Sequence, residues 1–139
     1  MNGKRFRRYL LSTMVGLWLA LDAPFAAGQA IFESTVAGQP IPKQYQSWSI
    51  FLICNPQWLM SENDAKLSGL HQQFRSFGHA IGASHLAVWF WKRAPAPGRP
   101  VADNIDVDRN AAMCAKLKLL PSRSPYVVVT TQYPEARLR

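Results

Sequence analysis

The sequence predicts a small α/β domain organised around a strand–helix–strand unit. Two short runs, residues 48–54 and 86–91, are almost continuously apolar and rich in aromatic and β-branched residues. Such runs are typical of strands that are buried on both faces of a parallel sheet. Between them, residues 61–82 repeat apolar side chains at spacings of three and four, as an amphipathic helix does. A chain of 139 residues is expected to form one domain.

The first 30 residues have the three parts of an export signal. Residues 1–8 hold four of the sixteen basic residues, residues 9–21 form an apolar run, and small residues follow at 26–30. That order is typical of a secretory signal peptide, and the run is shorter than the ~20 apolar residues of a spanning helix. We therefore expect an exported protein, periplasmic or secreted, with an uncleaved N-terminal membrane anchor as the alternative. The other residues keep twelve basic and seven acidic side chains, a net charge of +5.

The central helix is the clearest single element. Residues 31–46 lead into the domain and include a possible edge strand around residues 31–36. After the first apolar strand, Ser61 can cap the helix, with Asp64 three residues later as in a capping box. Gly82 is placed to end it. Its predicted buried stripe consists of Leu67, Leu70, Phe74, Phe77 and Ile81.

A shorter helix and a third strand complete the predicted domain. Asp106 and Asp108 suit the start of a helix, where negative charge is favourable. Its predicted inner stripe consists of Met113, Leu117 and Leu120. Pro121 ends this helix, and the apolar residues 126–131 then predict a strand.

The order of these elements resembles the thioredoxin-like fold. Residues 50–58, IFLICNPQW, resemble the family's central strand and the tryptophan before its active site. Ser124-Pro125 stands where the family keeps a cis-proline. Two further matches are the polar turn at residues 104–106 and the short helix at residues 112–120.

This resemblance implies a three-layer thioredoxin-like sandwich with central parallel strands in a βαβ unit. It would cover residues 47–133, with residues 134–139 as a tail. The family adds an antiparallel strand and a last helix after the strand matched by residues 126–131, so we expect a fold truncated at its C-terminus. One face and one edge of the sheet should then be short of cover, unless residues 31–46 or a partner fills the gap, and an uncovered edge strand invites pairing.

The two cysteines of the family's active site are missing from this sequence. In the family they follow the tryptophan at the start of the helix, but Leu59-Met60-Ser61-Glu62 follow Trp58 here. The family's dithiol–disulfide exchange therefore does not carry over, and we predict no catalytic residues and no cofactor. The resemblance still implies a peptide-binding surface, which consists of Trp58, Ser124, Pro125 and Tyr126.

The two cysteines, Cys54 and Cys114, allow three interpretations. They can be two buried inert thiols, a structural disulfide, which an oxidising compartment permits, or a single-thiol redox site. In the aligned fold one lies in the central strand and the other in a flanking helix, so they can face each other.

Other charged and metal-binding residue types give no recognisable site. His71, His79 and His85 are scattered without a carboxylate or cysteine at ligand spacing, so we predict no metal site. Lys92 and Arg93, with Arg99, form a basic loop that can contact an anionic membrane surface. We expect no nucleic-acid binding, because an exported protein rarely meets nucleic acid.

Together these observations predict an exported, non-catalytic binding or scaffolding module of the cell envelope. It is expected to associate with an envelope protein or with itself. The alternative is a single-cysteine thiol redox protein that uses Cys54 or Cys114. A degenerate or truncated gene product is a third reading.

Overall fold

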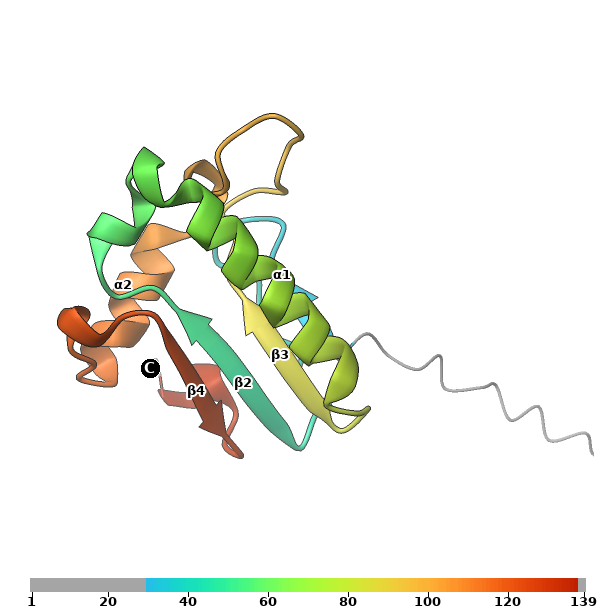
Figure 1. Ribbon diagram of the computed structural model, residues 1–139. Helices are drawn as coiled ribbons and strands as arrows, with labels where there is room; N and C mark the ends of the chain where they lie inside the picture. The colour runs from blue at the N-terminus through green and yellow to red at the C-terminus, as the bar shows by residue number, and fades with distance from the viewer. Residues whose placement is uncertain (1–29, 138–139) are drawn as a thin grey trace, which may run out of the picture.

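A four-stranded mixed sheet forms the centre of the protein (Figure 1). The computed structural model describes residues 30–137, so the predicted export signal at 1–30, except for its last residue, and residues 138–139 lie outside the described part. The strand order is β1-β3-β2-β4, in which β1 and β2 pair in parallel with β3, and β4 pairs antiparallel with β2. The strands are β1 Ile31–Glu33, β2 Ser47–Leu52, β3 His85–Trp89 and β4 Tyr126–Thr130.

Two helices flank this sheet on opposite faces, as the predicted α/β class requires. The longer helix is α1, Asp64–Ala80, and the shorter is α2, Val107–Lys116. Because side chains alternate along a strand, β3 and the residues that follow it contribute to both cores. Leu86, Val88 and Phe90 pack toward α2. Ala87, Trp89 and Trp91 pack toward α1.

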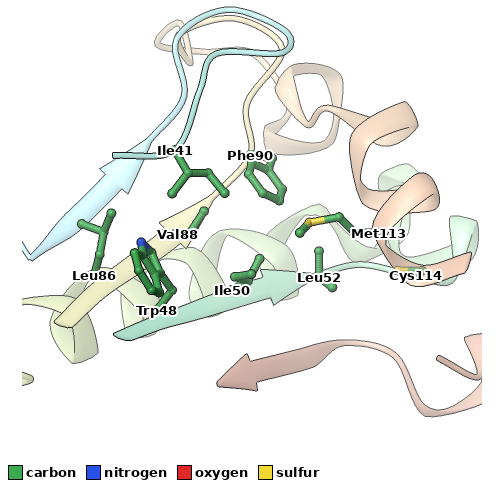
Figure 2. Packing of buried hydrophobic residues seen from close by; sticks show 9 residues of the cluster. All are labelled: Ile41, Trp48, Ile50, Leu52, Leu86, Val88, Phe90, Met113 and Cys114. Atoms are coloured by element: carbon green, nitrogen blue, oxygen red, sulfur yellow. The ribbon is translucent and has the colours of Figure 1, made fainter. Parts of the chain in front are cut away.

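The core on the α2 face draws on segments from both ends of the described chain. Figure 2 shows its nine buried residues, to which the lead-in contributes Ile41 and α2 contributes Met113 and Cys114. Near the C-terminus, Tyr133 packs edge-on against Trp48, with ring centroids 5.8 Å apart. The lead-in and the C-terminal residues thus cover the part of this face that α2 does not reach.

The core on the α1 face is aromatic. Leu67 and Phe74 of α1 are buried against the sheet, and Phe51 stacks on Trp89 at 4.6 Å between ring centroids. Near the end of α1, Gly78 lies so close to β1 that an added Cβ would be 2.2 Å from Ile31 Cγ1. The absence of a side chain at Gly78 therefore lets the helix approach the edge of the sheet.

The start of α1 differs from the predicted capping box. Two 3-10 turns, Pro56–Leu59 and Ser61–Asn63, precede the helix, and Ser61 does not cap it. Met60 is extended between the two turns, which delays the helix. The Asp64 carboxylate accepts a hydrogen bond from Ala102 N at 3.3 Å, so it joins the helix to a distant loop instead of to its own cap.

Two residues of the predicted buried stripes are exposed. Phe77 of α1 is 43% exposed and Leu120 is 55% exposed. Leu120 lies beyond the last residue of α2, so the helical stripe no longer applies to it. Phe77 lines a groove with Val127 of β4. On this face α1 does not extend over β4 (Figure 1).

Candidate functional site

The two cysteines form a disulfide that joins the end of β2 to α2. Cys54 lies two residues beyond β2, Cys114 lies within α2, and their Cα atoms are 5.7 Å apart. Of the three interpretations of these cysteines, the structure contains the disulfide. Both cysteines of the chain are used in it, so neither sulfur is a thiol here.

The predicted peptide-binding residues gather at the same end of the sheet. The peptide bond between Ser124 and Pro125 is cis, as the resemblance noted in the sequence implied. The Trp58 indole nitrogen donates to Ser124 O at 3.1 Å, and the Ser124 hydroxyl accepts from Cys54 N at 2.9 Å. Trp58, the disulfide and the loop before β4 therefore form one connected cluster.

The backbone of Ser124 is already hydrogen-bonded on both sides. Its N–H donates to Pro121 O at 3.1 Å, and its carbonyl accepts from Trp58. A ligand at this loop would thus meet side chains, not an unoccupied backbone N–H of Ser124. Tyr126, the next predicted surface residue, donates its hydroxyl to Leu120 O at 2.6 Å.

An apolar groove between α1 and β4 is a feature that the sequence did not indicate. Its volume is about 300 Å³. Pro125 lines one end, so the groove is continuous with the loop just described. Its eight lining residues are uncharged: Ser49, Phe51, Leu70, Gln73, Phe74, Phe77, Pro125 and Val127. No signal in the sequence indicated the groove, because it lies between elements far apart in the chain.

Strand β4 forms the outer side of this groove and the edge of the sheet. Within the described residues, β2 is the only strand paired with it. Val127 and Val129 are 58% and 65% exposed, and both lie on the α1 face because they are opposite Phe51 and Ser49 of β2. Residues 124–134 contain no charged side chain.

A histidine between two serines adjoins the groove, which it reaches through Ser49. His85 Nδ1 lies 2.6 Å from Ser47 Oγ, and its Nε2 lies 2.7 Å from Ser49 Oγ. Burial lowers the pKa of His85, which favours the neutral ring. A serine next to a histidine is a pair that nucleophilic catalysis uses. Here, however, the second nitrogen meets a serine in place of a carboxylate, and Ser49 is only 2% exposed. The arrangement satisfies buried polar groups beside an apolar groove.

A second titratable cluster ties β1 to α1. The Glu33 carboxylate is hydrogen-bonded to His71 and accepts from the Trp91 indole at 3.3 Å. Arg75 Nε lies 3.8 Å from its other oxygen. Burial by itself would raise the pKa of Glu33. The hydrogen bonds from His71 and Trp91 and the electrostatic attraction of His71 and Arg75 together outweigh the effect of burial, so the pKa of Glu33 is lowered. His79 and His85 lie outside this cluster. Among the described residues, no group of three His, Cys, Asp or Glu side chains is arranged to hold a metal ion.

The basic loop has one anchored side chain. Arg93 donates to Asn104 Oδ1 at 3.1 Å and to Asp103 O at 3.4 Å, which ties the loop to the polar turn. Lys92 and Arg99 are exposed. Contact of this loop with an anionic membrane remains a prediction.

Among residues 30–137, no helix has the length and apolar character needed to span a bilayer.

No family model matches this chain. No curated protein and no solved structure matches it either.

Proposed function

We propose that this chain is an exported, non-catalytic binding module of the cell envelope with a thioredoxin-like fold. The fold assignment is supported by the order of the elements, in which a tryptophan turn leads into α1 and a cis-proline precedes β4. The absence of catalysis is supported by Leu59-Met60-Ser61-Glu62 in place of the dithiol, and by the disulfide that occupies both cysteines.

The observation that carries the binding function is the uncharged edge formed by β4 and its groove. A strand with an exposed outer edge and apolar side chains tends to pair with another chain, and soluble proteins normally protect such edges. Val127 and Val129 are more than half exposed beside this groove, whereas the apolar side chains of the central strands β2 and β3 are buried. A protein segment that pairs with β4 and fills the groove would cover both.

Site-specific photo-cross-linking tests this function. A photoreactive residue replaces Val127 in one variant and Val36 in the control, because both valines are 58% exposed but Val36 lies after β1, in an isolated bridge with Arg93. In cells of the source organism, the variant at position 127 should cross-link to a protein chain and the control should not. Equal yields at the two positions, or no product at position 127, would refute binding at this edge.

Fractionation tests the predicted export. We expect the protein in the envelope or outside the cell, with an N-terminus near residue 31 when the signal is cleaved. An uncleaved protein in the membrane fraction would support the anchor in place of the signal. A full-length protein confined to the cytoplasm would contradict export while leaving the binding edge to the cross-linking test.

A further inference from the structure

We propose that the chain bound at β4 is a second copy of this protein, with the two β4 strands antiparallel and centred on Val128. The proposal rests on the proposed function only in using β4 as the binding edge. In this register all five residues of each β4 are paired. Val127 of one copy then lies opposite Val129 of the other.

Charge favours a second copy over a charged partner. Without the predicted signal at residues 1–30 the chain has a net charge of +5, so two copies repel each other in most relative orientations. The strand and the lining of the groove carry no charge, which makes this edge a place where two copies can meet without burying like charges. A strongly charged partner would find no complementary charge here.

The strand itself has none of the features that prevent edge pairing. Edge strands are usually protected by lysine, by proline within the strand, by a bulge or by a covering element. Tyr126–Thr130 contains neither a charged residue nor proline, and its residues pair with β2 in continuous register. Three consecutive valines at its centre also have high β propensity.

The symmetry of such a pair joins the two grooves. Antiparallel strands in one sheet are related by a two-fold axis normal to the sheet, so each face of one copy continues into the same face of the other. The two α1 helices would lie on one side of a continuous sheet. Between them, Val127 and Val129 of both copies would form a shared apolar floor, bordered by Phe77 of each copy.

Paired cysteine variants test the register. Val127→Cys and Val129→Cys are prepared separately, and because Cys54 and Cys114 are already bonded, each variant has one free thiol. Opposed residues of antiparallel strands have Cα atoms close enough for a disulfide. Under mild oxidation the mixture should give at least about tenfold more disulfide-linked dimer than either variant alone. Val36→Cys mixed with Val129→Cys is the control and should give none.

Equal linkage in all samples would indicate random collision and overturn the proposal, as would no linkage in the mixture.

Light scattering supplies a second readout that needs no new bond. The wild type should have the mass of two chains, Val127→Lys the mass of one, and Val36→Lys the mass of two. A monomeric wild type that still cross-links at position 127 to a different protein would overturn the dimer while the proposed function stood. No cross-link to any chain at position 127 would overturn both.

Discussion

At the scale of single residues, Glu33 connects the edge of the sheet to the helix above it. Its carboxylate lies on β1, and its partners are His71 and Arg75 of α1 and Trp91 after β3. His71 also lies against Trp89, with ring centroids 4.9 Å apart. The cluster therefore satisfies a half-buried charge within an aromatic layer.

Replacing Glu33 with Gln should weaken the protein in a pH-dependent way. Folding lowers the pKa of Glu33 below its ordinary value of 4.5. The ionised carboxylate therefore stabilises the folded protein fully above about pH 4.5, and this stabilisation is lost as the pH falls through the lowered pKa of the folded state. At pH 7 the variant should lose about 1–2 kcal/mol of unfolding free energy, since the hydrogen bonds involve a charged but partly exposed group. Urea denaturation at pH 7 and at about pH 3 measures this, and a wild type that keeps its full advantage at the lower pH would contradict the assignment.

At the scale of elements, the packing of α1 on β1 depends on Gly78. Glycine within a helix costs about 1 kcal/mol relative to alanine. The approach of Ile31 explains why glycine is nevertheless suited to this position, because Ile31 Cγ1 and Cδ1 and Ala87 Cβ all lie within 3.2 Å of the place a Cβ would occupy.

Gly78→Ala should therefore destabilise the protein although the same change usually strengthens a helix. We expect a loss of about 1–3 kcal/mol, typical of an overpacked contact. Gly69 of the same helix has no atom within 4 Å of an added Cβ, so Gly69→Ala is the matched control and should stabilise by up to about 1 kcal/mol. Thermal unfolding of both variants measures the difference. A gain in stability at both positions would show that Ile31 moves aside freely.

The elements that the sequence predicted well are those with a local periodic signal. Runs of apolar residues located β2, β3 and β4 to within about two residues, and the spacing of Leu67 and Phe74 located α1. The 3-10 turns before α1 were missed because an extended Met60 leaves no periodic signal. The stripe that includes Phe77 was predicted correctly as a stripe, but periodicity does not show which part of it another element covers.

At the scale of the whole molecule, the two faces of the sheet are covered by different means. On the α2 face, Arg109 donates to Glu135 at 2.5 Å and to Gln39 O at 2.7 Å, which joins α2 to both the C-terminal turn and the lead-in. On the α1 face, one helix covers β1 and β3 and leaves β4 open (Figure 1). The sequence did not indicate which face would be open, because that depends on contacts between residues nearly one hundred positions apart, such as Ile41 N with Glu135 at 3.3 Å.

The disulfide acts on the whole chain, because it closes a loop between two residues 60 positions apart. A cross-link of this length restricts the unfolded chain and is expected to stabilise the folded state by about 4 kcal/mol. This loop contains α1, β3 and most of α2, so its closure constrains most of the domain.

The double variant Cys54→Ala with Cys114→Ala should lose about 4 kcal/mol of unfolding free energy in denaturant unfolding, and its stability should not respond to a reducing agent. The wild type should fall to about the same stability when it is reduced. A reduced wild type within about 1 kcal/mol of the oxidised form would mean that packing around Cys114, and not the cross-link, holds α2 against the sheet.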